Sequence, residues 1–200
     1  MFSGAQISLY PMCDDYVARI LGALSALDPY RDRLRIETDD VSTLLVGTPD
    51  LVFAASRDLF AAVAKTGVHT TMSLMVSRGC PGEPDDPICH PPEGGFTTPP
   101  DRAAMLERVR QAEEIDLPIA AQFALLPLGV GEHMTPIYDC IGVLKDSGLF
   151  DKSKHFCSKL KGDAGKVFAL LEACFEGFGA PEGHLVLSAT VSANSPTTSA

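Results

Sequence analysis

The chain has 200 residues, of which 46% are hydrophobic and 21% are charged, a balance typical of folded globular proteins rather than disordered ones. Acidic residues outnumber basic ones by 26 to 16, so the formal net charge at pH 7 is -10. A surface of this charge repels phosphate backbones and anionic lipids, which argues against nucleic acid as a partner.

The N-terminal segment MFSGAQISLYPM lacks the basic and apolar regions of a secretory signal. No stretch approaches the roughly 18 apolar residues needed to span a bilayer, so membrane insertion is not expected. The six cysteines lack the regular spacing of a disulfide framework. Together these features predict a cytoplasmic protein with reduced thiols.

The first 81 residues predict a strand, a helix, two short strands, a second helix and a final strand. Apolar residues alternate in the first segment, and they recur at helical spacing in the second, where Asp14 or Asp15 caps the helix and Pro29 ends it. Thr48 as N-cap and Pro49 as first residue open the second helix. The expected strands are Ala5–Tyr10, Leu34–Glu37, Thr43–Val46 and His69–Ser77. The first helix is expected between its cap and Asp28-Pro29, with Val17, Ile20, Leu21, Leu24 and Leu27 at helical spacing, and the second runs from Pro49 to Gly67.

The segment Gly82–Asp101 is rich in proline and acidic residues, which predicts a loop or linker. A short amphipathic helix is expected over Arg102–Glu114. The last five residues, PTTSA, predict a frayed tail.

Two blocks of the second half repeat the first half in the same order. The block Val52–Pro81 aligns without a gap with Val167–Pro196, and nine of thirty positions are identical. AQISLYPM, from Ala5, aligns with AQFALLPL, from Ala121, at an offset that differs by one residue. The chain is therefore predicted to be a tandem duplication.

The second half repeats the order of elements, with helices expected near residues 133–147 and 164–179. This order predicts an α+β fold of two ferredoxin-like (βαββαβ) units. The expected organisation is a first repeat at 1–81, a linker and connecting helix at 82–117, a second repeat at 118–196 and a tail at 197–200. Both helices of such a unit lie on one sheet face, so the other face must pack against the twin unit, another subunit or a ligand.

Several residues invite a chemical interpretation. Cys80, Cys89 and His90 have no second ligand pair at zinc-like spacing, so no metal site is predicted, and a Cys80–Cys89 disulfide is the alternative under oxidising conditions. His69 and His184 occupy the same repeat position, as structural hydrogen-bonding residues or as acid–base groups. No catalytic or cofactor-binding motif is found, so no cofactor is expected.

Lysines gather in one stretch of the second half, at Lys152, Lys154, Lys159 and Lys161. Exposed lysines along a strand discourage pairing with other chains. The preferred interpretation is therefore a solvated sheet edge.

Polar side chains interrupt the otherwise apolar strands, and many of them recur in both halves. Small hydroxyl and amide groups beside aromatic rings suit a neutral heteroaromatic ligand, whereas an ordinary exposed sheet face would show the same pattern. The candidate ligand-binding residues are Ser8, Tyr10, Thr43, Ser73, Gln122, Ser158, Ser188 and Asn194.

Six sequence runs lie in order along nearly the whole chain: SLYPM with Asp14 and Asp15, STLLVG (42–47), SRGCPGE (77–83), QFALLPLG (122–129), GDAGKVFALLEACF (162–175) and SANSP (192–196). As a set, these runs resemble the YkoF family of thiamin- and hydroxymethylpyrimidine-binding proteins. The resemblance implies tandem ferredoxin-like, ACT-like repeats, a homodimer, and one pocket per repeat for the pyrimidine portion of thiamin. It also implies a non-catalytic role in precursor salvage or transport, with a functional link to a transporter.

The chain departs from the family pattern at one position that bears on the second pocket. The family's second copy tends to repeat the tyrosine of LYP, whereas this chain has Leu126 where the first copy has Tyr10. The second pocket is therefore expected to bind more weakly or to bind something different. A metabolite-sensing regulatory module and an enzyme of pyrimidine salvage that uses His69 and His184 remain alternative hypotheses.

Overall fold

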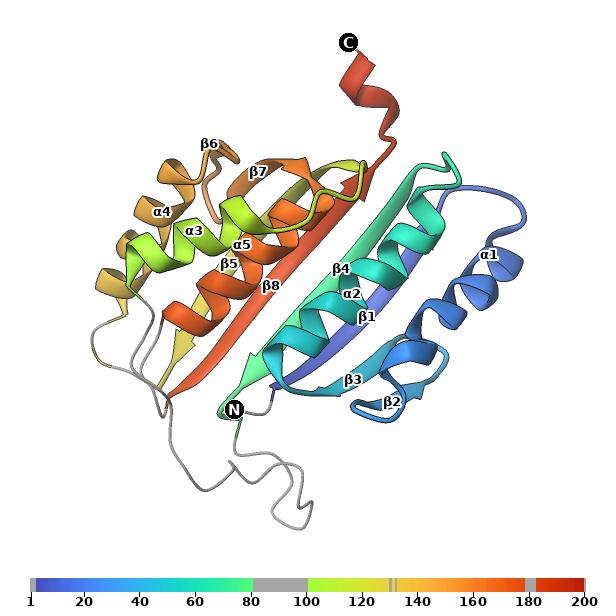
Figure 1. The fold of residues 1–200 in the computed structure, drawn as a ribbon, viewed down its shortest axis with the longest axis horizontal. Helices are drawn as coiled ribbons and strands as arrows, with labels where there is room; N and C mark the ends of the chain where they lie inside the picture. Colours follow the sequence, from blue (N-terminus) through green and yellow to red (C-terminus); the bar gives the residue numbers. More distant parts are fainter. Residues whose placement is uncertain (1–2, 81–100, 130, 132, 179–182, 200) are drawn as a thin grey trace.

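The computed structural model describes residues 3–80, 101–129, 131, 133–178 and 183–199, and it shows an antiparallel sheet with helices on one side (Figure 1). Within these residues the sheet has eight strands and the helical layer has five α-helices. The α+β class is confirmed, as is the tandem ferredoxin-like repeat. The predicted linker lies almost wholly outside the described residues.

The first repeat follows the predicted order of elements. Its first helix, however, is α-helical only to Ala23 and continues as a 3-10 helix that contains Pro29. Pro29 has no backbone N–H to donate, and Ser25 Oγ donates to Gly22 O at 2.8 Å, so regular α-helical bonding ends early. The elements are β1 (Ser3–Pro11), α1 (Tyr16–Ala23), η1 (Leu24–Tyr30), β2 (Arg35–Thr38), β3 (Thr43–Gly47), α2 (Pro49–Ala64) and β4 (Thr70–Arg78).

The second half adds the connecting helix and repeats the same six elements. The connecting helix is three residues shorter than expected, and Pro196–Ser199, predicted to be part of a frayed tail, form a short 3-10 helix. The elements are α3 (Arg102–Gln111), β5 (Pro118–Leu128), α4 (Met134–Asp146), β6 (Phe150–Ser153), β7 (Ser158–Asp163), α5 (Ala164–Gly177), β8 (His184–Ala193) and η3 (Pro196–Ser199).

The two repeats lie side by side and share one sheet, in the order β2-β3-β1-β4-β8-β5-β7-β6. Strands β4 and β8, the last of each repeat, pair antiparallel along the seam. Val52 aligns with Val167, an offset of 115 residues, and at this offset Leu74 corresponds to Ala189. These two residues are direct partners in the ladder, so a local twofold axis passes between them, perpendicular to the sheet.

Equivalent residues of the two repeats have equivalent surroundings. A Cβ atom built on Gly47 would lie 2.3 Å from a methyl carbon of Leu34, and one built on Gly162 would lie 2.5 Å from the same carbon of Leu149. Gly47 is the last residue of β3 and Gly162 the last but one of β7, each shortly before a helix, and both leucines precede the second strand of their repeat. The duplication has therefore preserved close packing as well as element order.

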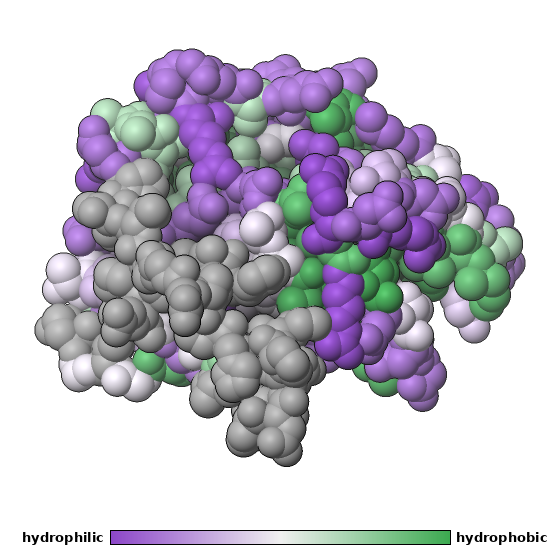
Figure 2. Space-filling model, turned by 60° about the horizontal axis from the view of Figure 1, so that its bottom comes forward, coloured by the Kyte–Doolittle hydropathy of each residue, from purple (hydrophilic) through white to green (hydrophobic). Residues whose placement is uncertain are grey.

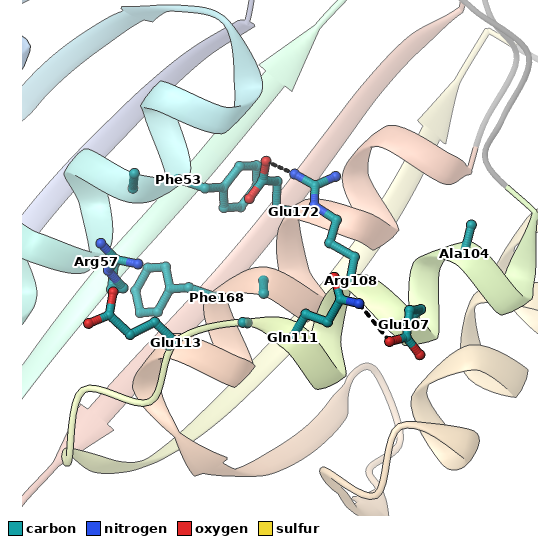
Figure 3. Close-up of a pocket in the computed structure, with 13 residues that line it drawn as sticks. Phe53, Arg57, Ala104, Glu107, Arg108, Gln111, Glu113, Phe168 and Glu172 are labelled. Atoms are coloured by element: carbon teal, nitrogen blue, oxygen red, sulfur yellow. Dashed lines mark hydrogen bonds and ion pairs between the residues drawn. The ribbon is translucent and has the colours of Figure 1, made fainter.

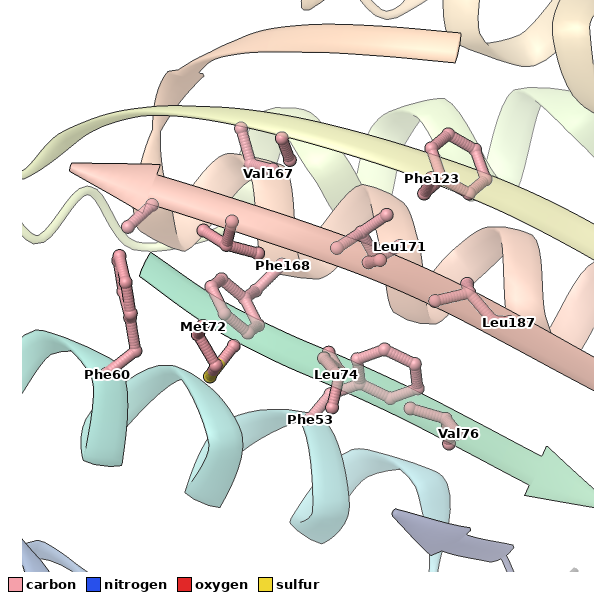
Figure 4. Close-up of a cluster of buried hydrophobic side chains, with 14 of the residues drawn as sticks. Phe53, Phe60, Met72, Leu74, Val76, Phe123, Val167, Phe168, Leu171 and Leu187 are labelled. Carbon is pink, nitrogen blue, oxygen red and sulfur yellow. The ribbon is translucent and has the colours of Figure 1, made fainter. Parts of the chain in front are cut away.

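One hydrophobic core lies between the helices and the sheet and crosses the seam (Figure 4). Phe53 of α2 and Phe175 of α5 are fully buried, and their ring centroids are 5.6 Å apart. Leu74 and Leu187 point from neighbouring strands toward the same layer. The two repeats therefore share one hydrophobic core, and burial of these side chains stabilises both.

The other side of the sheet, called here the open face, has no helix against it among the described elements (Figure 1). Successive side chains of a strand alternate between faces, so the residues between buried positions belong to this face. On the four central strands β1, β4, β8 and β5 its members include no Asp, Glu, Lys or Arg. They are Gly4, Gln6, Ser8, Tyr10, Thr71, Ser73, Met75, Ser77, His184, Val186, Ser188, Thr190, Ser192, Pro118, Ala120, Gln122, Ala124, Leu126 and Leu128.

Hydrophobic and hydrophilic side chains are segregated on the surface of the molecule. In the view of Figure 2, hydrophobic side chains group together at the right of centre, and hydrophilic side chains surround them. The exposed tyrosines of the chain include Tyr10, with 53% of its surface accessible, and Tyr138, with 64%.

Candidate functional site

The structure brings five of the eight predicted binding residues to the open face. Ser8 of β1 lies directly opposite Ser73 of β4, and Tyr10 lies one residue pair further along the same face. Gln122 of β5 and Ser188 of β8 lie on the open face of the second repeat, on the strands that correspond to β1 and β4. The candidate site is therefore two related polar areas on one continuous face.

The side chains of Thr43 and Ser158 point to the opposite, helix-covered side. Thr43 pairs with the buried Ile7, and Ser158 pairs with the buried Phe123. Both hydroxyl-bearing residues are themselves buried, with 6% and 8% of their surface accessible. Thr43 and Ser158 therefore lie on the other side of the sheet from the five predicted residues of the open face.

Asn194 has a structural role at the end of β8. Its backbone φ is 56°, and its side-chain Nδ2 donates to Ala64 O at 2.7 Å and to Val68 O at 3.0 Å. These bonds tie the last strand of the second repeat to the end of helix α2 in the first. The short polar side chain tolerates this left-handed backbone better than most residues do.

The paired histidines bond to serines of the opposite repeat. His69 Nε2 lies 3.2 Å from Ser192 Oγ, and His184 Nε2 lies 3.0 Å from Ser77 Oγ. At the repeat offset these two contacts are copies of each other. The arrangement favours a structural role at the seam over an acid–base role.

The lysine-rich stretch is only partly a sheet edge. Lys152 belongs to the edge strand β6, whereas Lys159 and Lys161 belong to β7, one strand further in. Lys159 Nζ lies 3.0 Å from Asp151 Oδ2, and Lys154 Nζ donates to Gln122 Oε1. The register places Lys159 and Lys161 opposite residues of the open face, so this face is positively charged at its second-repeat end.

A hollow of about 550 Å³ lies on the helical side, between α2, α3 and α5 (Figure 3). None of the predicted site residues lines it. Its walls carry residues from both repeats at equivalent positions, so the hollow lies beside the local twofold axis. The equivalent pairs are Phe53 with Phe168, Ala54 with Ala169, and Arg57 with Glu172.

The charged groups of the hollow already have protein partners. Arg108 Nη1 donates to Glu176 Oε2 at 2.5 Å, and its Nη2 donates to Glu172. Arg57 Nε donates to Asp58 Oδ1 at 2.8 Å. A ligand in this hollow would have to compete with these ion pairs, so the open face is the better candidate site.

Burial perturbs two groups near the hollow. It raises the pKa of Glu172 to about 7, although the neighbouring Arg108 opposes the shift. It also raises the pKa of Tyr30 to about 12, assisted by the bond from Tyr30 OH to Asp58 Oδ2 at 2.5 Å. No pattern in either repeat pointed to these residues, although the repeat alignment does place Arg57 over Glu172.

The described residues contain no group of three or more His, Cys, Asp or Glu placed to hold a metal ion. Of the residues weighed for a metal site or a disulfide, Cys80 is a free thiol, while Cys89 and His90 lie outside the described residues. None of the helices described is long and apolar enough to cross a membrane.

Comparison with known proteins identifies the family. The model of the YKOF-related family matches residues 2–83 and 119–198, once in each half of the chain. A curated relative, named "Putative HMP/thiamine-binding protein YkoF", from Bacillus subtilis (strain 168), is 31% identical over 194 residues. The alignment covers 97% of this chain and 91% of the relative. A match of this extent, repeated in both halves, shows that the chain belongs to the YKOF-related family.

Proposed function

We propose that the chain binds thiamin or its hydroxymethylpyrimidine (HMP) moiety on the open face and does not transform it. The name of the Bacillus relative supports the ligand class. The main structural support is Tyr10, an exposed aromatic ring beside the hydroxyls of Ser8 and Ser73.

The chemistry of the first-repeat area suits an aminopyrimidine. Such a ring is planar, carries nitrogen acceptors and an amino donor, and gains from stacking on an aromatic side chain. Ser8 Oγ donates to Val41 O at 2.9 Å, which fixes its direction and leaves its oxygen lone pairs able to accept. The thiazolium cation of thiamin would also be attracted to a chain whose net charge is -10.

The corresponding area of the second repeat has fewer groups that could bind an aminopyrimidine. Tyr10 aligns with Leu126 and Ser8 with Ala124, so this area lacks the aromatic ring and one hydroxyl. Ser188, the equivalent of Ser73, remains and is exposed. One pocket per repeat is therefore proposed, with the second binding more weakly.

A ligand bound on an open sheet face remains exposed to solvent on one side unless another surface covers it. We propose a homodimer in which a second copy covers the face and closes both pockets. Because the histidines are engaged with serines across the seam, the proposal favours binding without catalysis. The proposed role is salvage or transport of the thiamin precursor in the cytoplasm, in functional connection with a transporter.

Calorimetric titration with thiamin and with HMP tests the proposal. We expect two binding events of unequal affinity, loss of the stronger one in Tyr10→Ala, and its partial retention in Tyr10→Phe. Ser73→Val should weaken it as well. Tyr138→Ala, which removes an exposed tyrosine of α4, is the matched control and should bind normally.

Two outcomes would contradict this proposal in different ways. An absence of heat at millimolar ligand rules out the ligand class. Loss of binding in Arg57→Ala, with Tyr10→Ala unaffected, would move the site to the hollow of the helical layer. Mass spectrometry of thiamin recovered after long incubation should show it unchanged, and consumption of it would favour the enzyme alternative.

A further inference from the structure

Lysines of the second repeat gather at one end of the open face. Lys152 of β6 lies directly opposite Lys159 of β7, so both side chains point to the same side of the sheet. Lys159 also lies opposite Gln122 of β5, which identifies that side as the open face. Like charges placed directly opposite each other destabilise a sheet. We call this group the lysine cluster, and its members are Lys152, Lys154, Lys159 and Lys161.

The first repeat has the same strands without these positive charges. Glu37 lies opposite Leu44 there, as Lys152 lies opposite Lys159 in the second repeat. The same backbone pairing therefore forms with a carboxylate and an apolar side chain, so the fold of the unit does not require the lysines. The residues that correspond to the lysine cluster at the repeat offset are Glu37, Asp39, Leu44 and Val46.

Among the described residues, one carboxylate forms an ion pair with the cluster. Lys159 Nζ lies 3.0 Å from Asp151 Oδ2. The hydrogen bond from Lys159, together with the charges of the cluster, holds the pKa of Asp151 below its usual value. Lys154 Nζ donates instead to the neutral amide oxygen of Gln122. The cluster therefore keeps a local excess of positive charge, which attracts anions even though the net charge of the chain is -10.

Neutral hydrogen-bond donors lie beside the lysines on the same face. Gln122 Oε1 accepts from Lys154 Nζ and, at 3.7 Å, from Cys157 Sγ, so its amide N–H groups are the donors that it offers to a ligand. Thr190 of β8 lies opposite Gln122 and is exposed, so its hydroxyl is on the open face as well. Proteins bind phosphate oxygens with this mixture of lysine ammonium groups, hydroxyls and amide N–H groups.

The strand register connects the lysine cluster to the proposed ring site. From Ser73 to Lys159 the sheet crosses three strand spacings, roughly 14 Å, and the lysine side chain can reach back over part of this distance. The span suits a ligand of two linked rings and a phosphorylated arm, with its pyrimidine at Tyr10. Every position along this row of the open face has a polar side chain: Ser8, Ser73, Thr190, Gln122 and Lys159.

We propose that the lysine cluster binds the phosphate group of a ligand whose aminopyrimidine ring lies at Tyr10, so that this pocket prefers a phosphate ester of thiamin to thiamin itself. The inference rests on the proposed function for the ring and names the substrate class of that site. Inorganic phosphate or pyrophosphate would use the same lysines but would not need Tyr10. The two sources of phosphate can therefore be distinguished.

Calorimetric titration of the full chain with thiamin, thiamin monophosphate and thiamin diphosphate tests the proposal. The added charge contacts should make the diphosphate bind at least about tenfold more tightly than thiamin. Salt screens such contacts, so most of this preference should disappear at about 1 M ionic strength, where the Debye length is about 3 Å. Equal affinities for thiamin and its diphosphate at low salt would overturn the proposal.

Variants of the lysines identify where the phosphate binds. Lys152→Gln with Lys159→Gln, which removes the directly opposed pair, should reduce the preference to about twofold or less. Lys154→Gln leaves the ion pair of Lys159 intact and should reduce the preference about threefold, so it gives a result even if the double variant does not fold. A full preference in both variants would overturn the assignment to the cluster.

A matched control separates the cluster from a general effect of charge. Lys65→Gln with Lys145→Gln removes two positive charges from exposed residues of the helical layer and should leave the preference unchanged. Circular dichroism confirms that each variant is folded. An equal loss of preference in this control would mean that net charge, and not the lysine cluster, favours the phosphate ester.

Pyrophosphate alone separates this inference from the proposed function. We expect it to bind weakly both to the parent and to Tyr10→Ala, and not to Lys152→Gln with Lys159→Gln. Pyrophosphate that binds the parent as tightly as thiamin diphosphate does would make the free anion the ligand and overturn the link to Tyr10. If no thiamin compound binds while pyrophosphate binding still depends on the lysines, the proposed function fails and the phosphate site is supported.

Discussion

His69 Nε2 lies 3.2 Å from Ser192 Oγ, and this contact joins the first repeat to the second across the β4–β8 seam. Its copy, His184 with Ser77, crosses the same seam in the opposite direction. Two equivalent polar contacts at the ends of the shared ladder add to the backbone hydrogen bonds between the strands. They explain why the same histidine occurs in both halves without requiring chemistry from it.

Removing one of these contacts should therefore weaken folding. We expect His69→Ala to lower the free energy of unfolding by about 1 kcal/mol in urea denaturation, the usual contribution of one side-chain hydrogen bond. Ser192→Ala should cost a similar amount, and the double variant should cost less than the two together. The exposed His133→Ala is the control. Full additivity would show that the two side chains do not interact.

The glycines near the ends of β3 and β7 should not accept a side chain. A Cβ on Gly47 would lie 2.3 Å from Leu34, so Gly47→Ala should destabilise the protein by about 1–3 kcal/mol. Gly162→Ala should do the same through Leu149. Gly22→Ala in α1, where no atom lies within 4 Å of the new carbon, should instead stabilise by up to about 1 kcal/mol. Equal melting temperatures for the three variants would contradict the packing described.

The N-caps of α2 and α5 provide a matched pair. The side chain of Asp163 accepts from Ile115 N and Leu117 N at 3.0 Å and from Gly165 N at 2.8 Å, whereas its equivalent Thr48 makes no side-chain capping bond. Burial of Asp163 works against the carboxylate, yet these backbone donors hold its pKa below the usual value.

Asp163→Ala should therefore cost at least about 2 kcal/mol, and Thr48→Ala much less. Equilibrium denaturation at pH 7 measures both. Comparable losses would mean that Asp163 is not the anchor of the segment before β5. Because the folded pKa of Asp163 is lowered, its contribution is present above the unfolded pKa and declines as acid protonates the folded carboxylate.

Glu172 should give stability the opposite dependence on pH. Its folded pKa, about 7, lies above the unfolded value of 4.5, so its contribution is complete below pH 4.5 and is lost as pH rises toward 7. We expect this loss to be on the order of 2 kcal/mol in the wild type. Glu172→Gln should flatten the profile of unfolding free energy between pH 4.5 and 7.5. An unchanged slope would show that the carboxylate stays ionised beside Arg108.

Much of the fold was predictable because it depends on local patterns and on duplication. The alternation of Ala5, Ile7 and Leu9 marks a strand, and Thr48-Pro49 marks a helix start, without knowledge of their neighbours. The repeat alignment then extended each assignment to the other half. The boundaries proposed for the two repeats stay predictions.

Which residues share a face was only partly predictable. Thr43, Leu45 and Gly47 alternate with Leu44 and Val46, so both sides of β3 have apolar residues and the pattern does not identify the buried side. The pairing of Thr43 with Ile7 settles the matter, and that pairing joins β3 to β1, which are separated along the chain by α1 and β2, so no local turn sets it. The separation of Thr43 and Ser158 from Ser8 and Tyr10 therefore lay beyond periodicity.

Composition, hydrophobic period and internal repetition were enough to establish the class of fold, the duplication and the asymmetry between Tyr10 and Leu126, because each is a property of neighbouring or aligned residues. The seam between β4 and β8 and the hollow beside the local twofold needed the folded chain. They arise from contacts between residues more than a hundred positions apart, such as His69 and Ser192. Those contacts exist only once the two repeats share one sheet.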